Sequence, residues 1–363
     1  MIIGIDASRA AKKFKTGTEY YSIEIIKAIS NIDRENQYIL YSPVPLPKEL
    51  ENLPSNFSVK IMPFTKLWTQ IRLSMYFLRH KPDIFFEPAH TLPIIYPKKT
   101  VVTLHDAAFN YYPELFTNFE KFYHPWSMKF SAKRATRIIA PSEDTKKDII
   151  KFYNVAPDKI TVIYHGLNRE IFIPDKRSSY KHGKYILFIG RLEEKKNVLG
   201  LIKAYEILRQ RGDITHKLVL VGRDGFGIER IKEAINALPV KIAKDVIITG
   251  YISQDEKVKL LQNADLFVLP SFFEGFGLPI LEAMACGCPV ACSNITSLPE
   301  IAADAAMMFD PYKSKEISEA MTKIILNPKL KNELITKGFQ RTNTFSWEKA
   351  GEKTLEVILN SLQ

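Results

Sequence analysis

The sequence predicts an α/β protein built from two doubly wound, Rossmann-like domains, and three observations lead to this fold class. The chain has 363 residues, which is more than one hydrophobic core usually organises. Short apolar runs alternate with longer stretches of helical periodicity, a pattern typical of parallel sheets covered by helices. The same alternation occurs on both sides of residues 162–174, where we expect the chain to cross between the domains.

The expected elements define the domain limits. The expected strands are residues 2–5, 37–41, 84–86, 100–104 and 137–140 in the first half, and 185–189, 217–221, 246–249, 266–269 and 289–291 in the second. Helical patterns lie at residues 19–30, 198–210 and 255–262, and only helical patterns remain after Pro311. We therefore expect domains at residues 1–167 and 168–345, with a last helix in residues 346–363 that packs back on the first domain. Ligands of such sheets bind beyond the carboxyl ends of the strands, so two facing domains would place two sets of loops across one cleft.

The composition is that of a globular protein with a basic surface. Apolar residues make up 46% and charged residues 25% of the chain, and the formal net charge is +11. This charge favours anionic partners, namely nucleic acid, anionic lipid or phosphorylated substrates. No apolar run reaches the roughly 18–20 residues that span a bilayer, and the first residues resemble a buried strand rather than a signal peptide. We therefore expect a cytoplasmic protein.

The three cysteines lie close together but do not predict a metal site. Cys286, Cys288 and Cys292 have no His or Asp at ligand spacing beside them. Their surroundings indicate a helix end that runs into a strand, so we expect buried thiols in a reducing cytoplasm. An Asp-x-Asp motif is also absent from the sequence, and we expect no metal cofactor.

The strongest motif is the stretch from Ser271 to Val290, which follows a predicted strand. Glycines in its loop allow a ligand to approach the backbone closely, and Pro279 suits the first turn of a helix. Glu274 then lies on the loop and Glu282 about two turns into the helix, so the two carboxylates can bind hydroxyl pairs on different parts of one long ligand. From residue types alone, an exposed helix carboxylate and a charge near a helix N-terminus are the more ordinary interpretations.

This stretch resembles the Glu, seven residues, Glu signature of retaining glycosyltransferases, and specifically of glycosyltransferase family 4. The resemblance covers essentially the whole chain, because further landmarks of the family occur in order. It implies the GT-B architecture, with an N-terminal acceptor-binding domain and a C-terminal domain that binds a nucleotide sugar. It also implies that Glu274 contacts hydroxyls of the donor sugar and that Glu282 holds the ribose. The loop residues implied to lie at the donor are Gly275, Phe276, Gly277 and Leu278.

A second landmark places two cations between a predicted strand and a helix. Arg191 and Lys196 can converge there on a diphosphate, Arg as a bidentate fork and Lys as a point charge, while Lys195 is expected to be solvated. Helix N-terminal N–H groups would add positive potential. The resemblance implies that this Arg and Lys stabilise the leaving diphosphate, and two cations in this position replace a metal ion.

Weaker landmarks lie at the ends of other expected strands. Gly17 and Thr18 open the first helix, where the family has two glycines and this chain has one, and we expect them near phosphate or acceptor. His105 follows a strand, and the resemblance implies that its backbone carbonyl faces the anomeric carbon, although a lone His is more often structural. Asp106 is expected to orient this loop or contact the acceptor.

The remaining candidates concern the nucleotide. Gly222 and Arg223 follow a strand and are expected to approach nucleotide or phosphate. Tyr251 and Ile252 belong to a loop that resembles the base-contacting loop of the family, in which backbone groups read the base. Ser142 is expected to cap a helix.

Two segments bear on whether the protein binds to a membrane surface. Residues 66–81 and 121–137 hold Lys and Arg but no acidic residue, and aromatic residues follow helical spacing in the second segment. A basic, aromatic helix can lie in an anionic membrane interface, which suits a lipid-linked acceptor. In the alternative, the aromatic residues face the domain core and the cations face water.

The sequence thus predicts retaining transfer of a hexose from a nucleoside diphosphate sugar to a free or lipid-linked saccharide. The overall pattern most resembles mannosyltransferases that use GDP-mannose in bacterial surface polysaccharide assembly. A UDP-glucose or UDP-N-acetylglucosamine donor is an alternative, and a sugar-nucleotide epimerase shares the architecture without needing an acceptor. A nucleic-acid-binding protein would account for the basic charge, but the charges are spread along the chain, so we expect no nucleic-acid partner.

Overall fold

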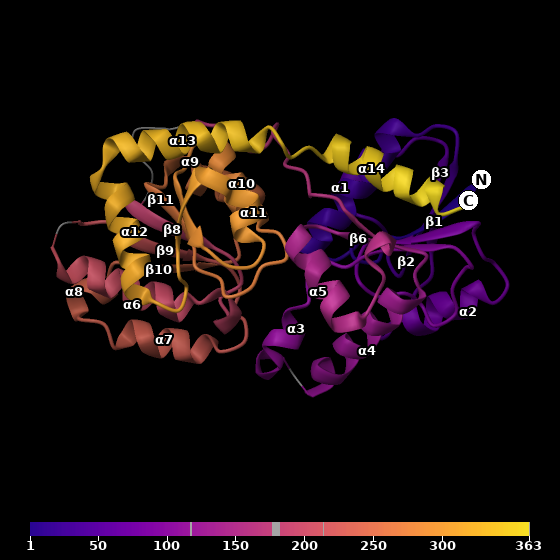
Figure 1. Cartoon of the computed structure of the whole chain (residues 1–363), viewed down its shortest axis with the longest axis horizontal. Helices are drawn as coiled ribbons and strands as arrows, with labels where there is room; N and C mark the ends of the chain where they lie inside the picture. Colours follow the sequence, from indigo (N-terminus) through magenta and orange to yellow (C-terminus); the bar gives the residue numbers. More distant parts are fainter. Residues whose placement is uncertain (117, 176–181, 213, 363) are drawn as a thin grey trace. The chain divides into compact units, whose positions relative to one another are not determined.

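The computed structural model describes residues 1–116, 118–175, 182–212 and 214–362 (Figure 1). The chain forms two compact units. Unit 1 comprises Met1–Pro113, Thr117–Gly166 and Ser346–Gln363, and unit 2 comprises Glu114–Phe116 and Leu167–Phe345. Each unit is a parallel sheet covered by helices, as the alternating sequence pattern predicts.

Unit 1 contains a seven-stranded sheet in the order β3-β2-β1-β4-β5-β6-β7, with all pairs parallel. The strands are β1 (Ile2–Asp6), β2 (Gln37–Ser42), β3 (Phe57–Ile61), β4 (Ile84–Glu87), β5 (Thr100–Thr103), β6 (Arg137–Ala140) and β7 (Ile160–Val162). Because β1 pairs with both β2 and β4, the strand order reverses at β1. The loops that follow β1 and β4 therefore diverge at the carboxyl edge of the sheet, where α/β sheets bind ligands.

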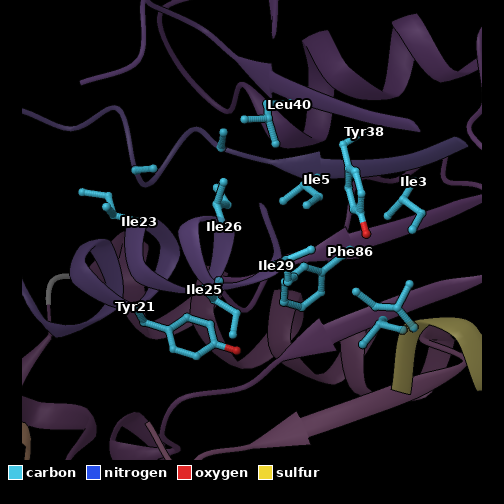
Figure 2. Packing of buried hydrophobic residues seen from close by; sticks show 14 of the residues in the cluster. Ile3, Ile5, Tyr21, Ile23, Ile25, Ile26, Ile29, Tyr38, Leu40 and Phe86 are labelled. Carbon is cyan, nitrogen blue, oxygen red and sulfur yellow. The ribbon is translucent and has the colours of Figure 1, made fainter. Parts of the chain in front are cut away.

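The core of unit 1 lies between this sheet and two helices from opposite ends of the chain. The helices of the unit are α1 (Gly17–Ile32), α2 (Ser74–Phe77), α3 (Ala108–Tyr111), α4 (Asn118–Arg134), α5 (Glu143–Tyr153) and α14 (Trp347–Asn360). A π-helical turn, η2 (Thr69–Leu73), precedes α2. Figure 2 shows Ile25, Ile26 and Ile29 of α1 packed with sheet residues such as Ile5 and Phe86, and Ile358 of α14 belongs to the same cluster.

Unit 2 contains a six-stranded parallel sheet in the order β10-β9-β8-β11-β12-β13. Its strands are β8 (Tyr185–Ile189), β9 (Lys217–Val221), β10 (Val246–Gly250), β11 (Leu266–Leu269), β12 (Val290–Ser293) and β13 (Ala306–Phe309). Its helices are α6 (Val198–Gln210), α7 (Ile228–Asn236), α8 (Val240–Ala243), α9 (Gln254–Asn263), α10 (Leu278–Ala285), α11 (Leu298–Ala302), α12 (Ser314–Leu326) and α13 (Pro328–Thr342). Here the strand order reverses at β8, between β9 and β11.

All ten expected strands are present, but three further strands were not predicted. β3 is an exposed edge strand without an apolar run, and β7 has only three residues. β13 has the sequence Ala-Met-Met-Phe, whose Ala and Met favour helix, and its pairing with β12 overrides this preference. The expected strand at 289–291 begins one residue later, at Val290.

The cysteines are buried thiols, as predicted. Burial raises the pKa of Cys286 and of Cys292 to about 12, which makes both poor nucleophiles. Within the described ranges, no group of three or more His, Cys, Asp or Glu side chains is placed to hold a metal ion. No helix in the same ranges combines the length and the apolar character needed to cross a bilayer.

Candidate functional site

The best-formed site in unit 2 lies where the strand order reverses between β8 and β11. The chain leaves β8 through Arg191 and a 3₁₀ turn, Glu194–Lys196, which ends at Asn197 in the left-handed conformation with φ 53°. Asn tolerates this conformation, and its side chain caps α6 by accepting a hydrogen bond from Gly200 N. This turn fixes the position of Lys196, the last residue before the cap.

Lys196 forms an ion pair with Glu274, which follows β11. Lys196 Nζ lies 2.6 Å from Glu274 Oε1, and the two side chains are only 17% and 12% exposed. Ser271 Oγ donates a second hydrogen bond to the same carboxylate oxygen at 2.7 Å. The structure therefore joins two residues that the sequence assigned to different parts of the ligand, Lys196 to the diphosphate and Glu274 to the sugar.

The backbone of Glu274 is also held in place. Glu274 N donates to Thr296 Oγ1 at 3.3 Å, and Ser297 Oγ donates to Glu274 O at 2.8 Å. Because backbone and carboxylate are both anchored, the carboxylate can present its remaining lone pairs to hydroxyl donors without reorganising.

A second ion pair holds the other predicted carboxylate. Glu282 lies on α10, which begins after Gly277, where φ is 102° and an added Cβ would lie 2.7 Å from the Leu298 side chain. Lys257 Nζ of α9 is 2.6 Å from Glu282 Oε1, with side chains 14% and 12% exposed. The same ammonium lies 4.9 Å from the centre of the Phe172 ring. Lys257 thus fixes and neutralises Glu282.

The loops after β8, β9 and β10 are fastened to one another. Gly222 N donates to Gly250 O at 3.0 Å, and Leu192 N donates to Arg223 O at 2.9 Å. Gly222 has φ 149°, and a Cβ there would lie 1.8 Å from Gly190 O, so only glycine fits. The predicted nucleotide residues Gly222, Arg223, Tyr251 and Ile252 therefore lie on neighbouring loops at one edge of the sheet.

Two predicted residues lie apart from the ion pairs. The Arg191 side chain is 61% exposed, with Nε 3.6 Å from Glu193 Oε2, and so does not join the described contacts of Lys196. Phe276 is buried, with its ring 5.8 Å from that of Phe345. The side chain of Phe276 is therefore part of the core, and only its backbone can meet a ligand.

Unit 1 has its own cluster of polar groups where its strand order reverses. Asp6 ends β1 and Glu87 ends β4, and both are buried. Asp6 accepts hydrogen bonds from Ser8 N and Thr69 Oγ1, and Glu87 Oε1 accepts one from Ala89 N at 2.9 Å. Burial and the adjacent Asp6 raise the pKa of Glu87 well above its ordinary value, which favours the protonated form of this carboxyl.

His105 is a buried neutral imidazole. Its Nε2 lies 2.7 Å from Pro88 O and donates to that carbonyl, while His105 N donates to His90 Nδ1 at 3.3 Å. Burial lowers the pKa of His105 to about 4. The ring packs edge-on against Tyr21 at 4.6 Å. The side chain therefore fastens the loop, which leaves the backbone as the part of His105 that can meet a ligand.

The first turn of α1 carries the other predicted residues of unit 1. Gly17 and Thr18 begin the helix, and an added Cβ at Gly17 would meet no atom within 4 Å. Glu19 accepts a hydrogen bond from Thr16 N at 3.0 Å and pairs with Arg9 at 3.3 Å. Asp106 Oδ1 accepts a hydrogen bond from Ala108 N in the loop after β5.

Sequence reasoning missed several residues that shape these sites. Lys257 has no local signal, because its partner is 25 residues away on another helix. Ser271, Thr296 and Ser297 look like ordinary loop residues. Asp6 and Glu87 could have been found, since each is an acidic residue directly after an expected buried strand.

Comparisons with known proteins cover both units. Residues 17–171 match the family described as Glycosyltransferase Family 4, and residues 170–341 match Glycosyl transferases group 1. O-antigen chain mannosyltransferase B of Escherichia coli is 26% identical over 97% of this chain and 98% of its own length. O-antigen chain mannosyltransferase RfbU of Salmonella typhimurium is 26% identical over 88% of this chain and 90% of its own.

A solved structure confirms the predicted fold class. Sucrose-phosphate synthase from Thermosynechococcus elongatus has a TM-score of 0.80 to this chain at 17% identity, and the likeness covers 99% of this chain and 98% of that one. At this level of identity the likeness concerns the fold, two Rossmann-like domains of the GT-B type.

The buried Glu87 predicts a pH-dependent difference in stability. A carboxyl whose pKa is raised on folding stabilises the protein fully below its unfolded pKa and loses that contribution as the pH rises. Glutamine imitates the protonated form without titrating. Relative to wild type, Glu87→Gln should therefore gain unfolding free energy as the pH rises above about 5, by up to about 1.4 kcal/mol per pH unit.

Urea unfolding followed by tryptophan fluorescence measures this difference in unit 1, because Trp68, Trp126 and Trp347 all lie there. Glu51→Gln, at an exposed carboxyl of the same unit, should give no change of slope. Parallel pH profiles for wild type and Glu87→Gln would contradict a raised pKa of Glu87.

Proposed function

Because the chain belongs to glycosyltransferase family 4, we propose that it transfers mannose from GDP-mannose to a saccharide hydroxyl with retention of the anomeric configuration. The Lys196–Glu274 ion pair carries this proposal, since it places a cation and an anchored carboxylate at the ligand-binding edge of the sheet in unit 2. The names of the two O-antigen mannosyltransferases support the choice of mannose. In this proposal unit 2 binds the donor and unit 1 binds the acceptor.

Charge stabilisation of the leaving diphosphate is the main catalytic contribution. The Lys196 ammonium has three N–H donors, so it can keep Glu274 and still donate to a phosphate oxygen. The exposed Arg191 guanidinium can add a bidentate contact. Two cations then compensate the charge that grows on the diphosphate, and the reaction needs no metal ion.

The proposed reaction uses no nucleophile from the protein. The bond between the anomeric carbon and the phosphate oxygen breaks, and the acceptor oxygen forms its bond to the same face of the sugar. The departing phosphate oxygen takes the acceptor proton, so atoms and charges balance. Glu274 orients the sugar through its hydroxyls. In unit 1, the bond from His105 Nε2 to Pro88 O fixes the loop that carries the backbone of His105.

Glu282 holds the ribose in this proposal, and Lys257 is its positioning residue. A carboxylate that accepts two adjacent hydroxyls must keep one orientation, and the 2.6 Å bond from Lys257 supplies it. The base is read by backbone groups near Tyr251 and Ile252, so side chains there do not distinguish guanine from uracil.

The acceptor is a free or lipid-linked saccharide of a surface polysaccharide or glycolipid. With a lipid-linked acceptor the enzyme works in the cytoplasm at the inner face of the cell membrane. The basic side chains then attract the phosphate groups of the donor and of lipids, and nucleic acid is not a partner.

A thermal-shift series in EDTA tests the donor. A ligand that binds only the folded state raises its stability, by about 2.7 kcal/mol at a hundred times its dissociation constant. GDP and GDP-mannose should raise the melting temperature, and added Mg²⁺ should not change the result. Stabilisation by UDP and its sugar conjugates alone would replace mannose with another hexose. Folded protein that responds to no nucleotide would refute the proposed donor site.

Lys257→Met tests the ribose assignment separately. Loss of the ammonium leaves the Glu282 carboxylate without its fixed partner, so the dissociation constant of the stabilising nucleoside diphosphate should rise about tenfold, in line with a lost charge-assisted hydrogen bond. Lys259→Met, at an exposed lysine of the same helix, is the matched control and should bind like wild type. An unchanged dissociation constant for Lys257→Met in calorimetric titration would exclude this role.

A further inference from the structure

The outward face of α4 is aromatic rather than polar. Phe119, Phe122 and Trp126 are 61%, 75% and 41% exposed, and their spacing of three and four residues places them on one side of the helix. The buried side of the helix consists of small and flexible residues, Ser127, Met128, Ser131 and Ala132. A surface helix normally turns its apolar side to the core, and α4 reverses this rule. The alternative left open by the sequence, in which the aromatic residues face the core, is therefore wrong for these three residues.

A second apolar stripe lies on the turns η2 and α2. Leu67, Ile71, Met75 and Leu78 are 42%, 40%, 60% and 62% exposed. Ile71, Met75 and Leu78 recur at intervals of four and three residues and so share one helical face, while Leu67, with φ 51°, precedes these turns. The opposite face holds the buried Leu73 and Phe77, among others. Unit 1 thus presents two helical faces with large apolar side chains in water.

One loop joins the two stripes. Leu92 N donates to Ser131 Oγ of α4 at 2.9 Å, and Ile95 N donates to Ser74 Oγ of α2 at 3.2 Å. Between these anchors Ile94 is 51% exposed. Figure 1 places α2 and α4 at the same edge of unit 1. The loop thus connects the two helical segments, and we call their exposed apolar and basic side chains together the apolar-basic surface.

The charge of this region is predominantly positive. Residues 61–82, 88–105 and 121–142 contain no Asp or Glu. They contain Lys66, Arg72, Arg79, Lys81, Lys98, Lys99, Lys121, Lys129, Lys133, Arg134 and Arg137. On α4, Lys129 and Lys133 continue the exposed side beyond Trp126, at intervals of three and four. The nearest acidic residue on that helix is Glu120, in its first turn.

We propose that the apolar-basic surface docks unit 1 on an anionic lipid bilayer, with Phe119, Phe122 and Trp126 in the headgroup–acyl boundary and the lysines at the lipid phosphates. Aromatic rings favour that boundary, and each cation near an anionic leaflet strengthens binding about fivefold. This inference rests on the proposed function in one respect, the supply of a lipid-linked acceptor at the membrane. A second copy of the chain fits less well, because a symmetric contact would set these cations against one another.

Flotation with lipid vesicles and no nucleotide tests the proposal on the full chain. Vesicles with 30 mol% phosphatidylglycerol should bind wild type at least about tenfold more strongly than pure phosphatidylcholine vesicles, and salt should weaken binding. The double variant Phe122→Ser/Trp126→Ser removes two exposed rings and should bind about tenfold or more weakly. Lys129→Gln/Lys133→Gln should lose about 25-fold on the anionic vesicles alone.

The control changes equally exposed apolar residues elsewhere. Val240→Ser/Leu326→Ser alters side chains of unit 2 that are 84% and 51% exposed, and it should bind vesicles like wild type. Lipids brominated in their acyl chains should quench part of the tryptophan emission in wild type and distinctly less in Trp126→Phe.

Two outcomes would overturn the proposal. One is equal binding of wild type and both surface variants to anionic vesicles. The other is a dimer in vesicle-free solution that the Phe122→Ser/Trp126→Ser variant abolishes, which would make a second copy the occupant. The vesicle experiment contains no nucleotide, so it tests the membrane proposal independently of the donor. The protein can bind vesicles and yet show no response to GDP-mannose in the thermal-shift series, or respond to GDP-mannose and yet not bind vesicles.

Discussion

The contact between Lys196 and Glu274 depends on the strand order of unit 2 and explains most of the site. The reversal at β8 makes β8 and β11 neighbours, so the loops that follow them meet although 78 residues separate the two side chains. Beside the ion pair, Phe272 N donates to Lys195 O at 3.0 Å, which joins the same two loops through their backbones. Asn197 fixes one side of the contact, and Ser271 and Ser297 fix the other. The Lys196 ammonium and the Glu274 carboxylate, which can accept hydrogen bonds from hydroxyl groups, are thereby held in direct contact before any ligand binds.

Both units hold partly buried carboxylates through ion pairs. In unit 2 Glu274 and Glu282 are each paired with a lysine. In unit 1 the buried Glu19 also has a cationic partner. In the same unit, burial raises the pKa of Glu87 and lowers the pKa of His105 to about 4, so that both side chains favour their neutral forms.

Much of this architecture could be predicted, and the failures have physical causes. Buried parallel strands leave apolar runs that are easy to recognise, whereas the exposed edge strand β3 leaves none. Glu274 and Glu282 were found because their loop is a recognisable motif, yet neither lysine could be assigned as their partner, since such pairs depend on which strands and helices become neighbours. The convergence of Arg191 and Lys196 on a diphosphate stays a prediction, and the 61% exposed Arg191 side chain lies 3.6 Å from Glu193. The aromatic spacing on α4 was visible in the sequence, but only the fold decides which side of that helix meets water.

The division of labour between Lys196 and Glu274 is the central claim, and calorimetric titration of Glu274→Gln tests it most directly. The dissociation constants of the nucleoside diphosphate and of its sugar conjugate are compared in this variant, in Lys196→Ala and in wild type. If Glu274 holds the sugar and Lys196 the diphosphate, Glu274→Gln should weaken binding of the sugar conjugate about tenfold or more while the diphosphate binds at least as well as before. Lys196→Ala should weaken both ligands alike. Equal losses for both ligands in Glu274→Gln, or no loss in either variant, would contradict the account.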